Sequence, residues 1–224
     1  MDISFINNLK DKLIPLEQYT SFDWQRFNKD SSKALSESTE LSDYLGVVGM
    51  SSLDHLRPAS VLISLVNQRD NKWHVILTQR AKHLKNHAGE ICFPGGRFEE
   101  VDLTLQQTAI RETEEEIGLD HSCIEILGRL PRQITISQYY VSPYIAIYRP
   151  KTDFLINHLK LDENEVENVF TVPLDFLLDE KNHQIVERSI NGVSFSYYSI
   201  EYKNNNIWGA TARMLVNFSH LLKK

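Results

Sequence analysis

The sequence predicts a mixed α/β (α+β) fold in which a mixed β-sheet is sandwiched between helices. Short runs of β-branched residues recur from residue 56 onwards. One long helical pattern interrupts these runs near residue 110, and a second one closes the chain. Strands on both sides of one long helix, followed by a terminal helix, suggest a sheet with helices packed on its faces.

The composition limits the class of protein. The chain has 224 residues, enough for one domain with a sizeable core and an extension. Hydrophobic residues make up 42% and charged residues 24%, which is ordinary for a soluble globular protein. The formal net charge of −6 argues against a general nucleic-acid-binding protein, because such a protein would show a basic face.

The N-terminus and the cysteines indicate a reducing, cytoplasmic compartment. The stretch "MDISFINNLKDKLIPLEQ" is too acidic and polar for a signal peptide, and no apolar run approaches the length of a membrane span. Cys92 and Cys123 form neither a CxxC motif nor a disulfide framework. Cys92 lies in the apolar run "ICF", where we expect a small buried side chain.

The first 55 residues predict a helical or irregular extension, ahead of a domain formed by residues 56–224. The stretch "FINNLKDKLI" has apolar residues at helical spacing. The stretch "NKDSSKALSESTELSDYL" is polar enough to predict a mobile loop followed by a short helix.

The domain begins with a predicted hairpin. The β-branched runs "ASVLISLV" and "WHVILTQR" are separated by "NQRDNK", which suits a polar turn. The stretch "GEICFPGG" then predicts a short strand closed by a turn at Pro94, Gly95 and Gly96. Three further segments read as strands and two as helices: strands for "IEILGRL", "YVSPYIAIY" and "GVSFSYYSIEY", and helices for "PLDFLLD" and "IWGATARMLVNFSHLLKK".

The acidic stretch between these strands predicts the long helix. Thr104 and Gln107 can form a capping box at its start, and Gly118 stands where a C-cap glycine belongs. Asp102 adds an anion near the helix N-terminus. The face that can dock on the sheet carries three residues at helical spacing: Ile110, Thr113 and Ile117.

A second face of this helix gathers Glu112, Glu115 and Glu116, whose spacing predicts that their carboxylates project together. Neighbouring glutamates on one face repel by roughly 1–3 kcal/mol per pair at ~6 Å, and only Arg111 is near in sequence to offset this repulsion. A solvated acidic face is the alternative reading. A divalent cation resolves the repulsion, and oxygen-only ligands select Mg²⁺ or Mn²⁺.

These residues resemble the signature box of the Nudix hydrolases. The family's box is usually a glycine, five residues, a glutamate, seven residues and then Arg-Glu-x-x-Glu-Glu-x-Gly. The matching positions are Gly96, Arg111, Glu112, Glu115, Glu116 and Gly118. The chain departs from the pattern in two ways, since Asp102 replaces the central glutamate and eight residues separate it from Arg111.

Both departures resemble the coenzyme A pyrophosphatase subgroup of the Nudix hydrolases. That subgroup also carries an upstream signature similar to "LTQRAKHLKNHAGEICFPGG", Leu77 to Gly96. Further similarity extends the resemblance to about residues 56–216. The resemblance implies hydrolysis of the diphosphate of coenzyme A or its derivatives, giving 3′,5′-ADP and 4′-phosphopantetheine.

The resemblance implies metal-assisted attack of water on phosphorus, with Mg²⁺ or Mn²⁺ held by Glu112, Glu115 and Glu116. Glu115, or a residue outside the box, is the candidate base. Arg111 is interpreted as the residue that orients Glu115. Glu165, in "DENEVENVF", lies where related enzymes place an additional acid, or is an exposed loop glutamate.

Several residues are candidates for substrate contacts. Gly95 and Gly96 are expected to present N–H groups to phosphate or to allow its close approach. The basic stretch "QRAKHLKNH" can meet the 3′-phosphate of coenzyme A, or is a charged loop. The resemblance favours three of its members: Arg80, Lys85 and His87. His87 is either a phosphate contact or a structural hydrogen-bonding residue.

Aromatic residues near the box have a packing and a binding interpretation. Tyr139, Tyr140 and Tyr144 can stack on adenine, although aromatic residues on strands more often pack in the core or on the surface. Trp208 is expected in the core.

Three alternative functions remain. The first is a Nudix hydrolase acting on ADP-ribose, NADH or a dinucleoside polyphosphate, and the second is a non-catalytic nucleotide sensor. The third is an isomerase, for which Cys92 is in an unsuitable apolar run. The expected partner is a small nucleotide, with no nucleic acid and no membrane, and a homodimer is possible.

Overall fold

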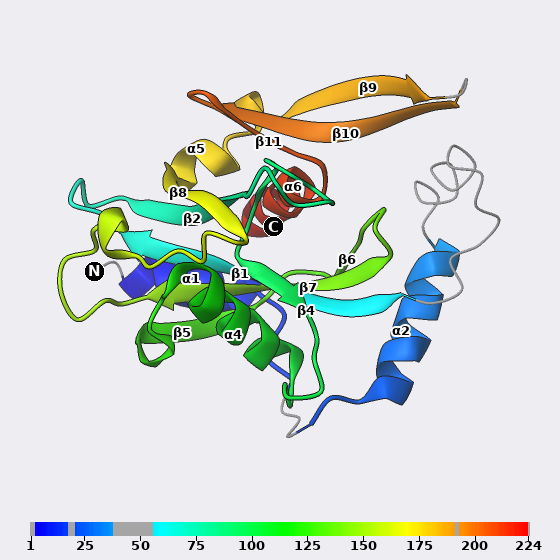
Figure 1. Cartoon of the computed structure of the whole chain (residues 1–224), viewed down its shortest axis with the longest axis horizontal. Coiled ribbons are helices and arrows are strands. Elements are labelled where there is room, and N and C mark those ends of the chain that lie inside the picture. Colours follow the sequence, from blue (N-terminus) through cyan, green and yellow to red (C-terminus); the bar gives the residue numbers. More distant parts are fainter. Residues whose placement is uncertain (1–2, 18–20, 38–55, 191–192, 224) are drawn as a thin grey trace.

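The computed structural model describes residues 3–17, 21–37, 56–190 and 193–223 (Figure 1). The helices are α1 (Ile3–Lys12), α2 (Trp24–Glu37), α4 (Leu105–Ile117), α5 (Leu174–Leu178) and α6 (Gly209–Lys223). The strands are β1 (Arg57–Asn67), β2 (Trp73–Arg80), β3 (Ile91–Cys92), β4 (Gly95–Arg97), β5 (Ile124–Arg129), β6 (Gln133–Ile134), β7 (Tyr139–Tyr148), β8 (Val166–Pro173), β9 (Gln184–Ile190), β10 (Val193–Tyr202) and β11 (Asn205–Trp208).

The main sheet is mixed. Its central path runs β3-β2-β1-β7-β5, while β4 pairs with β1, β6 with β7 and β8 with β2. The pairing of β1 with β7 is parallel, and the pairings of β1 with β2 and of β2 with β8 are antiparallel. The predicted hairpin of β1 and β2 is confirmed, with Leu65 opposite Val75.

Helices cover both faces of this sheet, as the sequence predicted. Along β1, Ile63 and Leu65 belong to a core that includes α1 and α6. Leu62 and Val66 belong to the opposite face, with residues of α4. Because side chains alternate across a strand, β1 is buried on both sides. Figure 1 shows α4 below the sheet and α6 above it.

A second sheet, of β9, β10 and β11, lies on the far side of α6 (Figure 1). Of these three strands only β10 was predicted, and the last two residues of β11, Ile207 and Trp208, were expected to begin the last helix. Ile200 and Ile207 join the core that α6 shares with the main sheet. Trp208 follows Ile207 on the strand and therefore points outward. Its exposure is 40% and its ring packs edge-on against Tyr197, so its expected place in the core is wrong.

The N-terminal extension is more ordered than the sequence predicted. Helix α1 confirms the helical reading of "FINNLKDKLI". Residues 28–37, predicted as a mobile loop, belong to helix α2, while the remainder of that stretch lies outside the described residues. Helix α2 forms because the Asp23 carboxylate accepts the Arg26 N–H at 2.9 Å. In addition, Phe27 and Ser31, one turn apart, are both buried.

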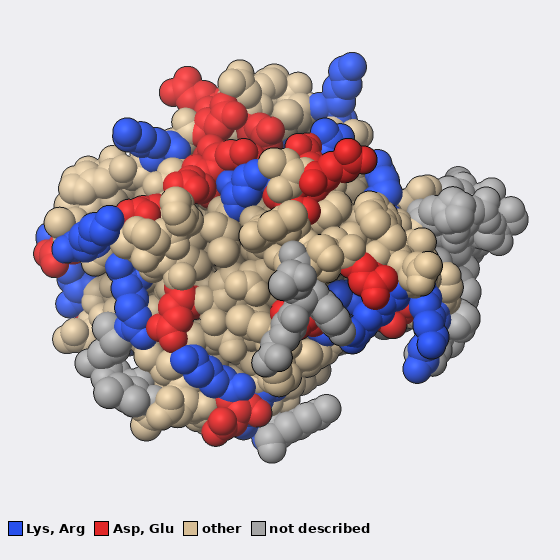
Figure 2. Space-filling model, turned by 90° about the horizontal axis from the view of Figure 1, so that it is seen from below, with Lys and Arg blue, Asp and Glu red and all other residues tan. Residues whose placement is uncertain are grey.

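The surface carries charges of both signs. Figure 2 shows acidic and basic side chains interspersed over the face seen from below Figure 1, with several acidic side chains grouped together. Among the described helices, none has the length and apolar character needed to cross a membrane.

Candidate active site

Helix α4 begins and ends where its sequence predicts. The Thr104 hydroxyl accepts the Gln107 N–H at 3.2 Å, and the Gln107 side chain accepts the Leu103 N–H at 2.8 Å. The reciprocal bond therefore reaches one residue before the cap rather than the cap itself. Gly118 ends the helix with φ of 69°, a left-handed conformation that suits glycine.

Gly95 and Gly96 lie in strand β4 rather than in the predicted turn. Strand β4 pairs with β1, with Gly96 opposite Ser60. The Gly95 N–H donates to Oε2 of Glu116 at 3.2 Å. A β-carbon on Gly96 would lie 2.4 Å from Cδ of Glu112. The two glycines thus hold the backbone directly against two carboxylates of α4.

Glu112 and Glu116 form a crowded, partly desolvated pair. The Glu116 residue is 3% exposed and the Glu112 side chain 13%. Burial raises the pKa of Glu116 to about 8, against the Gly95 hydrogen bond that lowers it, and the charge of Glu112 raises it further. Burial also raises the pKa of Glu112, although Arg111 acts in the opposite direction. For Glu112 the charge of Arg111, and for Glu116 the charge of Arg80, does not outweigh the effect of burial on the pKa.

Glu115 is the exposed member of the three glutamates. Its side chain is 59% exposed, and its Oε2 lies 2.8 Å from Nη1 of Arg111. The same nitrogen lies 3.0 Å from Oε1 of Glu112, so the carboxylates of Glu112 and Glu115 are close to each other. The exposures differ because α4 docks through Thr113, Glu116 and Ile117, which are buried, while Ile110 is only partly buried.

Arg111 and Asp102 connect the helix to the loop before it. Nε and Nη2 of Arg111 donate to the two carboxylate oxygens of Asp102, each at 2.8 Å. Asp102 also accepts the Glu99 N–H and the Thr108 hydroxyl, both at 3.0 Å. Burial opposes the charge on Asp102, but the Arg111, Glu99 and Thr108 hydrogen bonds lower its pKa overall.

Arg111 therefore has the orienting geometry expected of it, with one guanidinium joined to Asp102, Glu112 and Glu115. The anchoring role of Asp102 was not predicted from the sequence. The available signal was that Asp102 stands where the Nudix box usually has a glutamate. This match indicates that a carboxylate is needed at the position, but it does not indicate that Arg111 is the partner of that carboxylate.

Glu165 and Arg80 complete the charged surroundings. The charge of Glu165 contributes to raising the pKa of both Glu112 and Glu116, whereas Arg80 lowers that of Glu116. The Glu165 carbonyl accepts the Ala81 N–H at 2.8 Å, which fixes this acid beside the end of β2. A β-bulge at Gln79 and Arg80 redirects the arginine. Its Nε is buried and has no partner among the described residues.

The other basic candidates lie in the loop between β2 and β3. Main-chain bonds close this loop at Arg80, which accepts the Gly89 N–H at 3.1 Å. Lys85 is exposed within it. His87 has φ of 57°, and its Nδ1 lies 3.0 Å from a Glu90 carboxylate oxygen. That hydrogen bond raises the pKa of His87 and matches the structural interpretation of this residue.

The aromatic candidates serve packing in this structure. Tyr144 is 3% exposed and belongs to the core under α4. Arg57 lies 4.1 Å from the ring centre of Tyr139, and Arg132 lies 5.6 Å from that of Tyr140.

Cys92 is also a packing residue. Its Sγ lies 3.4 Å from the Thr78 hydroxyl, and burial raises its pKa to about 11. This pKa disfavours the thiolate that a catalytic cysteine would need.

The donor set suits a hard divalent cation. The atoms available to bind a metal ion are carboxylate oxygens. Gly96 leaves room for the Glu112 carboxylate, because a β-carbon on residue 96 would lie within 2.5 Å of it. Among the described residues, no three acidic, histidine or cysteine side chains stand together as a complete metal cage. Mg²⁺ is commonly held by one or two protein carboxylates, with water and substrate phosphate completing its coordination. Glu112 and Glu116 fit that requirement.

Comparison with known proteins decides the family. A sequence profile of the NUDIX domain matches residues 56–190, which is more than half of the chain. The chain belongs to the Nudix hydrolase family. It is similar to Nudix hydrolase 15, mitochondrial, from Arabidopsis thaliana, with 37% identity over 169 residues. That alignment covers 73% of this chain and 58% of the Arabidopsis protein, so the chain spans less than two thirds of this relative.

Other Nudix proteins are also similar to the chain. The uncharacterized Nudix hydrolase NudL from Yersinia pestis (strain Pestoides F) is 33% identical, over 71% of this chain and 76% of that protein. Among solved structures, the Nudix hydrolase RenU from M. smegmatis superposes with a TM-score of 0.46 and 17% identity. That match covers 58% of this chain and 79% of RenU. The match to the NUDIX domain profile confirms the Nudix fold expected from the sequence.

Proposed function

We propose that this Nudix protein hydrolyses the diphosphate bond of coenzyme A or its derivatives, giving 3′,5′-ADP and 4′-phosphopantetheine or its acyl form. The observation that carries the hydrolase assignment is the pair formed by the buried Glu116 and the partly buried Glu112. The pair lies against the backbone of Gly95 and Gly96 and faces the charge of Arg80. Glu112 and Glu116 would hold a divalent cation, and the positive charge of Arg80 would attract a diphosphate.

Each residue has a defined role in this proposal. A bound Mg²⁺ or Mn²⁺ neutralises the diphosphate oxygens and lowers the pKa of bound water. Glu112 and Glu116 would hold the cation, and Glu115, which lies beside Glu112, would be a third ligand. Glu115 or Glu165 accepts the proton of the attacking water. Arg111 orients Glu112 and Glu115 through the ion pairs described above.

The substrate contacts follow from the unpaired donors. Nε of Arg80 is buried without a partner among the described residues, so a phosphate oxygen would satisfy it. Gly95 and Gly96 allow phosphate to approach the backbone. Lys85 and His87 lie in the same loop as Arg80 and are exposed, which suits contact with the 3′-phosphate.

The choice of coenzyme A rests on sequence details. These are Asp102, the eight residues between it and Arg111, and the stretch "HAGEICFPGG". The Asp102 carboxylate accepts two hydrogen bonds from Arg111, so the acid at this position has a structural role in the site.

Space for the remainder of a substrate lies beside Glu165. An open groove of about 460 Å³ is lined by Ala81, His83, Leu159, Leu161, Glu163, Val166 and Glu167. Its lining combines apolar side chains with two acids, Glu163 and Glu167, which suits a neutral arm better than a phosphate because carboxylates repel anions.

A substrate panel tests the proposal. The purified protein is incubated with coenzyme A, ADP-ribose, NADH and dinucleoside polyphosphates in Mg²⁺ or Mn²⁺, and products are separated by chromatography. Coenzyme A should yield 3′,5′-ADP. Cleavage of another substrate without coenzyme A cleavage would support the alternative Nudix hydrolase, and binding without any cleavage would support the sensor.

Three substitutions sharpen the assignment. Glu115→Gln should abolish turnover while the fold stays intact. Lys85→Ala and His87→Ala should raise KM for coenzyme A more than KM for dephospho-coenzyme A, because only coenzyme A carries the 3′-phosphate. An equal effect on both substrates would contradict the assigned 3′-phosphate contact.

The remaining expectations accompany this function. We propose a cytoplasmic location, a small-nucleotide partner, and a Nudix domain over residues 56–224 with an extension over residues 1–55.

A further inference from the structure

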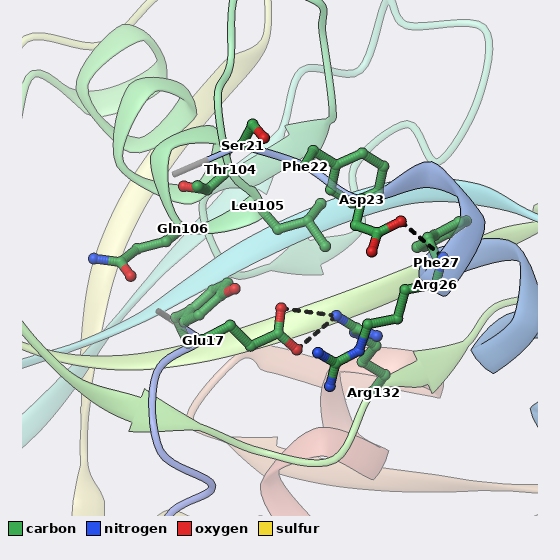
Figure 3. Close-up of a pocket in the computed structure, with 11 residues that line it drawn as sticks. Glu17, Ser21, Phe22, Asp23, Arg26, Phe27, Thr104, Leu105, Gln106 and Arg132 are labelled. Atoms are coloured by element: carbon green, nitrogen blue, oxygen red, sulfur yellow. Dashed lines mark hydrogen bonds and ion pairs between the residues drawn. The ribbon is translucent and has the colours of Figure 1, made fainter. Parts of the chain in front are cut away.

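The N-terminal extension contacts the loop that precedes α4. Its described part between Leu16 and Asp30 packs beside Phe98, Thr104 and Leu105. Figure 3 shows Phe22 and Phe27 of the extension beside Leu105 at the start of α4. It also shows Glu17 of the extension joined to Arg132, which lies between β5 and β6. The extension therefore reaches a segment only two residues beyond Gly96.

Ion pairs attach this part of the extension to the main sheet. Glu17 lies 3.3 Å from Nη2 of Arg129 and 3.1 Å from Nη2 of Arg132. Asp30 lies 3.3 Å from Nη1 of Arg132, whose side chain is only 8% exposed. Nε of Arg132 donates to the Ser142 hydroxyl at 2.9 Å. The low exposure of Arg132 makes these contacts stronger than ordinary surface ion pairs.

An aromatic cluster forms the contact with the loop. The Phe22 ring stacks on Phe98, with centroids 4.4 Å apart and an interplanar angle of 30°. Trp24 meets Phe98 edge-on at 5.8 Å. Phe27, which is buried, contacts both Phe22 and Tyr140. Rings at these separations and angles attract one another beyond the area they bury.

Phe98 lies in the loop between strand β4, which carries Gly96, and Asp102, which holds Arg111. Its N–H donates to the Pro58 carbonyl at 3.0 Å, next to the pairing of β4 with β1. The following N–H, of Glu99, donates to Asp102, which holds Arg111. A shift of Phe98 would therefore displace both Gly96, whose backbone lies against Glu112, and Asp102, which accepts the hydrogen bonds of Arg111.

The space enclosed by these contacts is too small for a ligand. Its volume is about 30 Å³, room for about one water. The residues around it consequently serve to hold the loop in place.

We propose that Phe22 is a positioning residue for the Nudix site. By packing on Phe98, it holds the loop from Arg97 to Leu103, and so keeps Gly96 against Glu112 and Asp102 against Arg111. This proposal rests on the hydrolase function proposed above. It assigns to the extension a role in catalysis without contact to the substrate.

The first test compares Phe22→Ala with a matched control, Phe5→Ala. Phe5 also lies in the extension, and its ring stacks on Trp73 at 5.9 Å, away from the loop. With the substrate that the panel identifies, Phe22→Ala should lower kcat about 10- to 100-fold with KM changed by less than about twofold. Phe5→Ala should leave kcat near wild type at a similar loss of melting temperature.

A conservative variant of Phe22 and a double-mutant cycle with Phe98 distinguish a positioning role of Phe22 from a general loss of folding. Phe22→Leu should restore most of kcat because it refills the space beside Phe98. In a double-mutant cycle, Phe98→Leu and Phe22→Ala should be non-additive in kcat. Equal kcat losses in Phe22→Ala and Phe5→Ala, or additive effects in the cycle, would overturn the proposal.

The second test does not depend on turnover. Hydrogen exchange of the amides from Gly95 to Leu103 should speed up in Phe22→Ala and not in Phe5→Ala. If exchange responds in this way while wild type cleaves no diphosphate, the loop is positioned but the hydrolase proposal fails. If exchange is unchanged, the positioning proposal fails whatever the substrate panel shows.

Discussion

At the scale of single residues, the carboxylate of Glu112 lies within 2.5 Å of the place that a β-carbon on residue 96 would take. Gly96 is opposite Ser60 in a regular strand pairing, and its φ is not positive, so the backbone itself does not require glycine. The requirement comes from Glu112, whose Cδ would be 2.4 Å from that β-carbon. Glycine is therefore needed at position 96 to make room for the Glu112 carboxylate, and not to allow an unusual backbone conformation.

Replacing Gly96 with alanine should cost activity and little stability. The Glu112 carboxylate ends a flexible side chain and can move away, which misplaces it by about 1 Å or more. We expect kcat to fall about 100-fold, with the free energy of unfolding changed by less than about 1 kcal/mol. Steady-state kinetics and urea unfolding measure the two quantities.

Gly209→Ala is the control for this substitution. Gly209 has φ of 64°, and a β-carbon added there would meet no atom of the described residues within 4 Å, so alanine adds backbone strain alone. Its kcat should stay near wild type. A Gly96→Ala enzyme with full activity would show that Glu112 has no fixed role.

A cation stabilises the protein if Glu116 helps to hold it. With Mg²⁺ at saturation, the melting temperature of wild type should rise, and that of Glu116→Gln should not. In EDTA at pH 7 the Gln variant should be the more stable of the two, because burial raises the pKa of Glu116 to about 8, so that folding at pH 7 has to protonate a group that is ionised in the unfolded chain. Thermal melting with and without Mg²⁺ measures both effects, and equal Mg²⁺ shifts in the two proteins would contradict the assignment.

The ion pair of Asp102 with Arg111 should give the stability a defined pH dependence. The folded-state pKa of Asp102 is lowered, so its contribution is full above the usual aspartate range and is lost as pH falls through the lowered pKa. Asp102→Asn should lower the free energy of unfolding by about 2 kcal/mol at pH 7. Urea unfolding should show this difference shrinking below about pH 4, and a difference that grows on acidification would refute the pairing.

At the scale of elements, the strand β4 is the part of the site that sequence patterns missed. Proline followed by two glycines favours a turn, and a three-residue strand has no periodicity to reveal it. Helix α4 was predictable because its caps and period are local signals. Which of its glutamates would be buried was not predictable, since that depends on how α4 docks against β1 and β4.

Gly95→Ala should unfold this element rather than change the chemistry alone. A β-carbon there would lie 2.3 Å from the Ser60 carbonyl oxygen and 2.6 Å from Cα of Val61, and φ is 151°. These are backbone atoms of β1 that cannot move aside. We expect a loss of about 3 kcal/mol or more in the free energy of unfolding, measured in urea beside Gly96→Ala, and equal losses in the two variants would contradict this distinction.

At the scale of the whole molecule, α6 forms the centre of a larger assembly of layers than the sequence predicted. It packs on the main sheet on one side and on the second sheet on the other (Figure 1). Strand β11 was missed because its last two residues, Ile207 and Trp208, read as the first turn of the helix that follows. Long-range pairing with β10 decides their conformation, and no local signal reports it.

Two aromatic substitutions should separate the core from the outer face. Phe218 is fully buried in α6, so Phe218→Ala should lower the free energy of unfolding by about 3–5 kcal/mol. Trp208 is 40% exposed and has its edge contact with Tyr197, so Trp208→Ala should cost about 1 kcal/mol. Urea unfolding of both variants measures the contrast, and similar costs would place Trp208 in the core after all.

The acids of the site are also joined through the main chain. The Asp162 N–H donates to the Glu116 carbonyl at 3.0 Å, and the Glu165 N–H donates to the Asp162 carbonyl at the same distance. Bonds between peptide groups persist when side chains change. The loops on either side can therefore diversify in sequence while this frame stays in register, which gives an evolving or engineered enzyme freedom to exchange one substrate for another.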